Sequence, residues 1–322
     1  MKIIAIEEAF SMDGLRGLPS VADMASSAIS IDPQVVEDWK ARLPDVTTLR
    51  LADMDAHGVD VQVLSLTVPG IQGIADAEAA VEDARAANDY LATVVAAHPD
   101  RFRGFAALPL QDPTAAAAEL HRCVRELGFC GALVNDTTNG QYLDEPPFEP
   151  VWQALENLGV PLYLHPGASV EPWSLVDDHP ELGGALWEWQ ARVGGHAMRL
   201  LFGGVFDRHP GARVILGHMG EFLPFQLSRF DSRYATLKER KLALLPSEYF
   251  GRNIFITTSG VCSPAALAGA VMAMGEDAVL FAIDYPYEST ATAVAFLDTA
   301  PLSPAAREKI AWRNAERLLG FS

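Results

Sequence analysis

Eight short apolar runs, separated by segments with helical patterning, restrict the fold of this 322-residue chain more than any other feature. Most of them are rich in Val, Ile, Leu or Phe without regular alternation, as expected for strands that are covered on both faces. The runs are Lys2–Glu7, Val59–Thr67, Phe102–Pro109, Gly131–Asn135, Val160–His165, Ala212–His218, Ile254–Ser259 and Val279–Asp284. A strand followed by a helix, repeated eight times, predicts a parallel (β/α)8 TIM barrel rather than an open sheet.

Helical patterns occupy most of the segments between these runs. We expect helices at Ala77–Ala97, Pro113–Leu127, Pro150–Leu158, Leu186–Val205, Phe222–Leu245, Pro264–Met274 and Pro304–Leu319. The connections over residues 8–58 and 166–211 are too long for a plain strand-to-helix loop, so they predict insertions after strands 1 and 5 that cover the C-terminal face as a lid. Because no linker or repeat interrupts the pattern, residues 1–322 are expected to form a single domain.

Composition excludes several classes of partner. Hydrophobic residues make up 49% of the chain and the net charge is -18, so a large core is expected, whereas binding to nucleic acid or to an anionic membrane surface is not. No uncharged apolar segment is long enough to span a bilayer. Three cysteines (Cys123, Cys130 and Cys262) lack metal-binding or redox spacing, and the missing signal-peptide pattern adds to the expectation of a cytoplasmic protein.

Four polar residues lie at or just past the ends of apolar runs: Glu7, His165, His218 and Asp284. The C-terminal ends of parallel strands meet at one mouth of a barrel, where carboxylates and imidazoles can converge on a divalent metal ion. For Glu7 alone, capping of a helix or pairing with an arginine explains a strand-end carboxylate better than a functional site does. Four such residues together are much harder to explain by folding, so they predict a metal-dependent active site.

The neighbours of these residues have mainly structural interpretations. Glu8 points away from Glu7 along a strand and is expected to be structural. Glu221 follows His218 by three residues and is expected to open a helix, from which it could fix the imidazole tautomer. The glycines on either side of His218 indicate close backbone approach or unusual dihedral angles. The remaining histidines are expected to be structural: His57, His98, His121, His179, His196 and His209, of which His196 is a packing residue or supports the site.

Several motifs along the chain match one enzyme family. They are Ile6-Glu7-Glu8-Ala9-Phe10, Asp53–Val59, Leu64-Ser65-Leu66, Arg101–Pro109, Gly131–Asn135, Leu164-His165-Pro166, Phe206–Pro210, Leu216–Glu221 and Asp284-Tyr285-Pro286. With these motifs the chain resembles the amidohydrolase-2 branch of the amidohydrolase superfamily, and within it the metal-dependent hydroxybenzoate decarboxylases of the dihydroxybenzoate or gamma-resorcylate type. The resemblance implies a (β/α)8 barrel with one divalent ion at its C-terminal mouth.

Site roles follow from the same resemblance. It implies that Glu7, His165 and Asp284 bind the metal, that His218 contacts the substrate, and that Glu221 supports His218. Many amidohydrolases have a histidine beside the first-strand ligand where this chain has Ala9, although some decarboxylases of the family also read Glu-Glu-Ala-Phe. The remaining set of two carboxylates and one imidazole favours Mn²⁺ or Mg²⁺, with Zn²⁺ as the alternative.

The resulting hypothesis is non-oxidative decarboxylation of an ortho-hydroxylated aromatic acid, without an organic cofactor. Asp284 would deliver a proton to the ring carbon that bears the carboxylate, and His218 would orient the departing group. The alternatives are a metal-dependent hydrolase or hydratase acting on a lactone, amide or unsaturated acid, and an inactive barrel that serves as a scaffold. A small aromatic acid is the expected partner, and the family suggests a homodimer or homotetramer. Arg42 and Arg50 in the first insertion could contact a second acidic group of the substrate, but surface charge is the favoured interpretation for both.

Overall fold

The parallel barrel predicted from the sequence is present in the computed structural model, which describes residues 1–16, 31–167 and 173–321. Its strands are β1 (Ile4–Phe10), β2 (Val61–Leu66), β3 (Phe102–Gly104), β4 (Ala106–Ala107), β5 (Ala132–Asn135), β6 (Leu162–His165), β7 (Val214–Leu216), β8 (Ile254–Thr257) and β9 (Val279–Leu280). The third predicted strand is divided into β3 and β4 at Phe105. There the chain changes partner, because the Phe105 amide donates to Leu64 O and the Ala106 amide donates to Gly131 O, both at 2.9 Å. The fold is therefore a (β/α)8 barrel with one divided strand.

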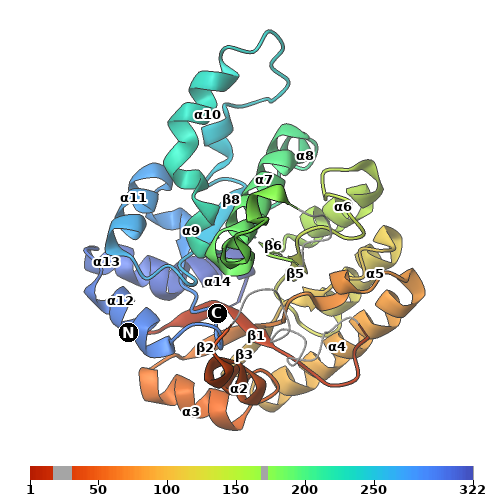
Figure 1. The fold of residues 1–322 in the computed structure, drawn as a ribbon, viewed down its shortest axis with the longest axis vertical. Helices are drawn as coiled ribbons and strands as arrows, with labels where there is room; N and C mark the ends of the chain where they lie inside the picture. Colours follow the sequence, from red (N-terminus) through yellow and green to blue (C-terminus); the bar gives the residue numbers. More distant parts are fainter. Residues whose placement is uncertain (17–30, 168–172, 322) are drawn as a thin grey trace.

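Helices surround these strands (Figure 1). They are α2 (Pro33–Arg42), α3 (Thr48–His57), α4 (Ala77–Ala97), α5 (Pro113–Arg125), α6 (Glu149–Leu158), α7 (Glu188–Phe202), α8 (Val205–Arg208), α9 (His218–Glu221), α10 (Leu227–Tyr234), α11 (Pro264–Met274), α12 (Thr290–Thr299), α13 (Pro304–Glu308) and α14 (Asn314–Leu319). α4 and α11 have the predicted bounds because capping side chains mark their starts: Asp76 accepts from the Ala79 amide, and Ser263 accepts from the Ala266 amide. Within the described residues, no helix is sufficiently long and apolar to cross a bilayer.

One predicted helix is wrong in length. The segment Phe222–Leu245 was expected to be helical throughout, but α10 ends at Tyr234. Beyond it, residues 238–241 are four consecutive charged side chains that offer no apolar stripe to pack against the barrel. The chain instead turns back, and the Leu242 amide donates to the Tyr234 hydroxyl at 2.7 Å.

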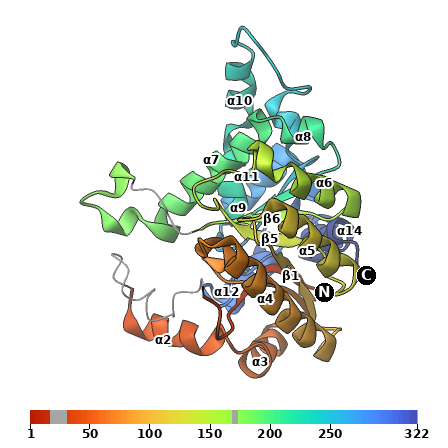
Figure 2. The ribbon, with the colours of Figure 1, turned by 90° about the vertical axis from the view of Figure 1, so that its right-hand side faces the viewer.

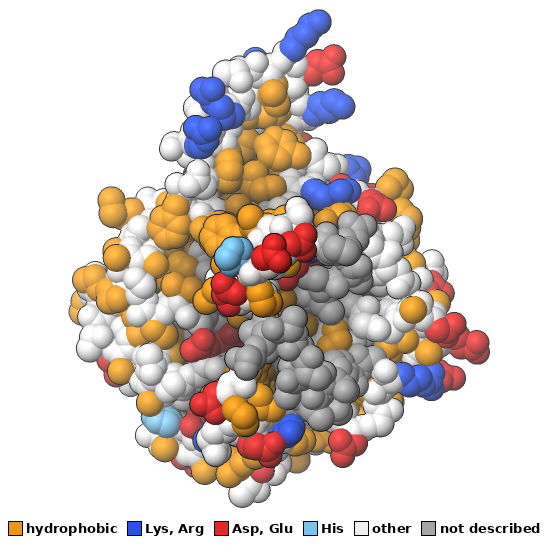
Figure 3. Space-filling model, in the orientation of Figure 1, with side chains coloured by type: hydrophobic (Ala, Val, Ile, Leu, Met, Phe, Trp, Pro, Cys, Tyr) orange, Lys and Arg blue, Asp and Glu red, His pale blue; other side chains and the backbone are white. Residues whose placement is uncertain are grey.

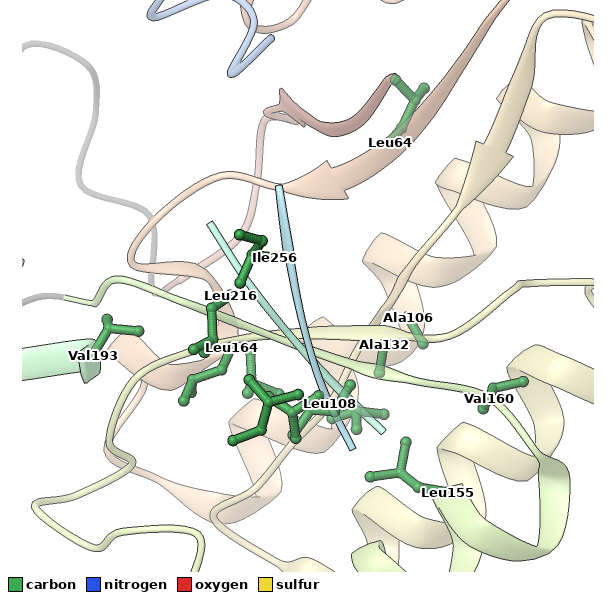
Figure 4. Packing of buried hydrophobic residues seen from close by; sticks show 14 of the residues in the cluster. Leu64, Ala106, Leu108, Ala132, Leu155, Val160, Leu164, Val193, Leu216 and Ile256 are labelled. Atoms are coloured by element: carbon green, nitrogen blue, oxygen red, sulfur yellow. The ribbon is translucent and has the colours of Figure 1, made fainter. Parts of the chain in front are cut away.

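Apolar side chains form two layers. The larger layer lies between strands and helices and includes Leu164, Leu216 and Ile256 from three adjacent strands (Figure 4). The smaller layer is drawn from alternate strand residues such as Ile4 and Ile6 and fills the inside of the barrel. The mouth of the barrel is thus supported from below by a dry apolar interior.

Parts of the two long connections project from one side of the barrel. α2 and residues 173–186 project from the side opposite the labelled termini (Figure 2). α2 reaches residues near the mouth, since the ring centroids of Trp39 and Tyr287 are 5.1 Å apart. Residues 17–30 and 168–172, on which part of the predicted lid falls, lie outside the described residues, so the lid stays a prediction.

Candidate active site

An extra residue in β1 determines which of its carboxylates faces into the barrel. Ala5 pairs with Gln62 and Glu8 with Leu64, so β1 advances by three residues where β2 advances by two. Such a β-bulge re-aims side chains. Ile6 packs in the interior layer and Glu7 contacts interior groups, whereas Glu8 points outward. Glu7 lies in the middle of β1 rather than at its predicted end, because the strand continues to Phe10.

The two oxygens of the buried Glu7 carboxylate have different surroundings. Oε2 accepts hydrogen bonds from the Tyr163 hydroxyl and, at 3.1 Å, from Thr257 Oγ1. Oε1 is buried and has no hydrogen-bond partner among the described residues. Gly217 packs directly on this carboxylate, since a Cβ there would lie 2.9 Å from both oxygens. One oxygen of Glu7 is thus fixed by hydroxyl groups, and the other is left for a ligand.

His165, the last residue of β6, presents an unprotonated nitrogen to that free oxygen. Its Nδ1 lies 2.8 Å from Pro166 O and 3.0 Å from Asn135 Oδ1; both are acceptors, so Nδ1 must carry the proton. Nε2 lies 3.5 Å from Glu7 Oε1. Burial lowers the pKa of His165 despite the opposing charge of Glu7, which favours the neutral ring. A neutral imidazole with Nδ1 anchored in this way is suited to bind a metal through Nε2.

His218 is placed between three carboxylates. Its Nδ1 lies 2.8 Å from Glu221 Oε1, and its Nε2 lies 3.5 Å from Glu7 Oε1 and 3.6 Å from Asp284 Oδ2. Burial opposes a charge on this ring, but the carboxylates of Glu221 and Glu7 outweigh burial and raise the pKa of His218 well above its ordinary value. The predicted hydrogen bond between His218 and Glu221 is confirmed.

The backbone that carries His218 is unusual. Glu221 was expected to open a helix, yet His218, Met219, Glu221 and Phe222 all have φ between 49° and 59°, in the left-handed region. The segment is therefore a strained turn and not a regular helix. Strain of this kind is concentrated at functional sites. The prediction of unusual dihedral angles beside His218 is confirmed, since Gly220 has φ 77°.

Asp284 completes the cluster from beyond the end of β9. It lies four residues after Leu280 and also has a positive φ, 78°. The possible ligand atoms of Glu7, His218 and Asp284 all lie within 4.8 Å of one another. Together with the unpartnered Glu7 Oε1 and the free Nε2 of His165, this donor set fits one divalent metal ion. The donor atoms that meet this distance include His218 and not His165, so the assignment of Glu7, His165 and Asp284 as the ligands stays a prediction.

Hydroxyl and aliphatic groups line the space beside these donors. Tyr287, Ala9, Ser65 and Thr67 are among the residues that line it. The Tyr287 hydroxyl lies 2.5 Å from Thr67 Oγ1. Trp187 does not line this space; it is 42% exposed and stacks on Phe222.

Several residues that support the site were not recognised from the sequence. Arg50 was expected at the surface, but it is fully buried and donates to Gln62 Oε1 at 3.0 Å and to Ala9 O. Its position on a helix of a long connection gave no signal of this burial. His196 was expected to be a packing or supporting residue; it is buried, and its Nδ1 lies 2.8 Å from Asp136 Oδ1. Tyr163 could have been noticed, because its spacing from His165 places both on the inner face of one strand.

Comparisons with known proteins agree with this geometry. A family model described as amidohydrolase matches residues 15–321. The chain belongs to this family. It is 42% identical to the gamma-resorcylate decarboxylase of Polaromonas sp. (strain JS666 / ATCC BAA-500) over 299 residues, which are 88% of this chain and 90% of that enzyme.

Two solved amidohydrolase-type structures are similar over nearly the whole chain. A 2,6-dihydroxybenzoate decarboxylase in complex with 2,6-dihydroxybenzoate superimposes with a TM-score of 0.92 at 40% identity, covering 99% of each chain. The dihydroxybenzoic acid decarboxylase of Polaromonas sp. JS666, with bound manganese and the inhibitor 2-nitroresorcinol, has a TM-score of 0.92 at 39% identity and covers 99% of this chain and 97% of its own. Both the barrel and the expected resemblance to hydroxybenzoate decarboxylases are confirmed.

Proposed function

We propose that this protein is a divalent-metal-dependent, non-oxidative decarboxylase of aromatic acids that carry a hydroxyl group ortho to the carboxylate. The observation that carries the proposal is the unpartnered Glu7 Oε1, with the Nε2 atoms of His165 and His218 each 3.5 Å away at the mouth of the barrel. In the proposed site Glu7, His165 and Asp284 hold the ion, for which manganese is favoured. When bound, the ion supplies positive charge and Lewis acidity toward an anionic, oxygen-bearing substrate.

The other side chains of the site have separate roles in the proposed reaction. His218, whose pKa is raised well above its ordinary value, offers positive charge to the substrate carboxylate, and Glu221 fixes its orientation through Nδ1. Asp284, in its protonated form, transfers its proton to the ring carbon that bears the carboxylate. The bond from that carbon to the carboxylate then breaks, its electron pair restores the aromatic ring, and CO₂ leaves. Asp284 recovers a proton from solvent before the next cycle.

A panel of aromatic acids tests this proposal. Purified protein is incubated with Mn²⁺ and with 2,6-dihydroxybenzoate, salicylate, 4-hydroxybenzoate or benzoate, and released CO₂ is measured. We expect CO₂ only from acids with an ortho hydroxyl group, and we expect chelation with EDTA to abolish its release. Parallel reactions with Mg²⁺ and Zn²⁺ rank the metals. Protein without added acid, and the Asp284→Asn variant with each acid, serve as controls.

The same material separates decarboxylation from the hydrolase and hydratase alternatives. Lactones, amides and unsaturated acids are offered under identical conditions, and loss of substrate is followed by chromatography. Turnover of one of these compounds without CO₂ from any hydroxybenzoate would overturn the proposal. If no metal binds and no compound is turned over, a scaffold role would be favoured.

We further propose that the enzyme works in the cytoplasm as a homodimer or homotetramer. Free thiols at Cys123, Cys130 and Cys262 suit a reducing compartment. Figure 3 shows Lys and Arg side chains gathered on the projection that includes α10, beside apolar side chains. Exposed apolar residues of this region are Phe202, Phe222, Phe225, Leu237 and Leu245. Patches of this kind often mediate association, and light scattering coupled to size-exclusion chromatography would reveal a monomer if the proposed assembly is wrong.

A further inference from the structure

We propose that Glu8 is a positioning residue that fixes Asp284 by holding the two backbone amides on either side of it. This inference rests on the proposed function, in which Asp284 is both a metal ligand and the proton donor. The Ile283 amide donates to Glu8 Oε1 at 3.0 Å, and the Tyr285 amide donates to Glu8 Oε2 at 3.2 Å. The Glu8 carboxylate thus accepts hydrogen bonds from the amides on both sides of Asp284, the proposed proton donor.

The backbone around Asp284 requires such support. Asp284 lies in irregular chain past the end of β9 and has a φ of 78°, which a residue other than glycine rarely adopts. Its neighbours Ile283 and Tyr285 are buried, at 0% and 2% exposure, so their amides need partners inside the protein. Glu8 supplies both partners, and the left-handed conformation of Asp284 is held between two fixed points.

The junction where the chain beyond β9 meets β1 explains why a side chain supplies these two hydrogen bonds. β9 pairs with β8, and the chain beyond β9 returns to β1 through the Ala9 amide, which donates to Tyr285 O at 2.7 Å. The two hydrogen bonds to Glu8 extend this junction on the outer side of β1. They take the place of backbone hydrogen bonds between strands, which the irregular chain around Asp284 cannot make.

The bulge in β1 links this support to the metal site. Because of the extra residue, Glu7 faces inward with its free Oε1, while Glu8 faces outward toward residues 283–285. Two consecutive residues of one strand therefore set the relative positions of Glu7 and Asp284. A movement of Asp284 by a fraction of an ångström would change both its distance to the metal and its aim at the ring carbon.

Arg50 favours the charged form of Glu8 and strengthens the same junction. It is fully buried, donates to Ala9 O, and places its guanidinium 4.5 Å from the centroid of the Tyr285 ring. Burial raises the pKa of Glu8 to about 8, whereas the Ile283 and Tyr285 amides and the charge of Arg50 act against this rise. Glu8 and Arg50 together hold the end of β1 and the residue after Asp284 from the outer side of the barrel, without touching the metal or the substrate.

The test compares Glu8→Gln with a matched control, Glu119→Gln. Glutamine has the shape of Glu8 but only one acceptor oxygen, so one of the two amides loses its partner. Glu119, on α5, is also a largely buried carboxylate. It accepts hydrogen bonds from Asn88 and Arg122 and lies outside the proposed site. For each variant, Mn²⁺ affinity is measured by direct titration, folding by circular dichroism, and kcat and KM on the hydroxybenzoate that the wild type cleaves.

We expect Glu8→Gln to fold, to bind Mn²⁺ about 10- to 100-fold more weakly, and to lose kcat by a similar factor while KM changes by less than about threefold. Glu119→Gln should retain wild-type values for all three quantities. Glu8→Asp, which keeps the charge but is shorter by one methylene group, should fall between the wild type and Glu8→Gln. A folded Glu8→Gln with wild-type Mn²⁺ affinity and wild-type kcat would overturn the proposal.

Two further outcomes are informative. If the wild type binds Mn²⁺ but releases no CO₂, the proposed function fails, whereas weaker Mn²⁺ binding by Glu8→Gln still supports the positioning role. If neither Glu8 variant folds, hydrogen exchange in the wild type decides the question. The Ile283 and Tyr285 amides should then be protected at the level of the strand amides; rapid exchange of both would refute the proposal.

Discussion

Inside the barrel, alternate residues of the strands are apolar and packed against one another, whereas at the mouth carboxylates and imidazoles lie on the same strands or just beyond them. Ile4 and Ile6 are fully buried in the interior layer, and the next residue of β1 is Glu7 with its unpartnered oxygen. The change from dry packing to a charged cluster therefore occurs within one residue. The interior provides stability, and the mouth holds groups that are costly to bury without a ligand.

Backbone conformation differs between the two regions as well. Eight described residues other than glycine have a positive φ, and six of them follow barrel strands at the mouth: Asp136, His218, Met219, Glu221, Phe222 and Asp284. Apart from the bulge in β1, the strands of the apolar interior pair in regular register. Most left-handed residues thus lie in turns at the mouth, where the packed interior below can support them.

The largest effect is expected from Asp284→Asn, which removes the proton donor and changes only one atom of the side chain. Turnover should fall by about 10²- to 10⁴-fold, and the melting temperature should stay near that of the wild type, because stability comes from the interior. CO₂ release and thermal unfolding are measured on the same preparation. Full activity in this variant would remove Asp284 from the mechanism.

An interior substitution should show the opposite behaviour. Ile4→Ala leaves a cavity in the fully buried inner layer and should lower the free energy of unfolding by about 2–5 kcal/mol. The kcat per folded molecule should remain unchanged, since the site lies above this layer. Denaturant unfolding and active-site titration measure the two quantities; loss of kcat in fully folded protein would show that interior and mouth are not separable.

A smaller effect is expected at the edge of the mouth. Asn135 Oδ1 lies 3.0 Å from Nδ1 of His165 and helps to fix the ring, although Pro166 O offers a second acceptor. Asn135→Ala should weaken Mn²⁺ binding by about 10-fold, at the lower end of the usual range for supporting hydrogen bonds. Isothermal titration with Mn²⁺ measures this change, and unaltered affinity would mean that Pro166 O alone holds the ring.

The smallest effect concerns acid stability outside the site. Burial alone would raise the pKa of Glu119, but hydrogen bonds from Arg122 and Asn88 outweigh it and hold the pKa below its ordinary value of 4.5. A carboxylate with a depressed pKa stabilises the fold above its unfolded-state pKa, and this contribution is lost as the pH falls through the lower, folded-state value. Between about pH 5 and 3, Glu119→Gln should therefore lose less stability than the wild type, by at most about 1 kcal/mol. Free energies of unfolding that change equally with pH in the variant and the wild type would contradict this prediction.

The fold could be predicted because its signals are local. Each apolar run marked a strand of the barrel, and α11 has the predicted bounds Pro264–Met274. The end of α10 could not be predicted in the same way. Whether a charged segment continues a helix depends on whether the protein offers a surface for it to pack against. Long-range packing determined that boundary.

The site was only partly predictable for a related reason. Glu7, His165, His218 and Asp284 were recognisable from their places along the strands, and the structure brings them together. The bulge that turns Glu7 inward, the two hydrogen bonds to Glu8 and the burial of Arg50 depend on contacts between segments far apart in sequence. No short motif carries that information.

The most direct test of the account is anomalous diffraction at the manganese edge from crystals grown with Mn²⁺. We predict one strong peak per chain, within bonding distance of Glu7 Oε1, His165 Nε2 and an Asp284 oxygen. A peak at any other place, or no peak at saturating Mn²⁺, would contradict the claim that these side chains form one metal site at the mouth of the barrel.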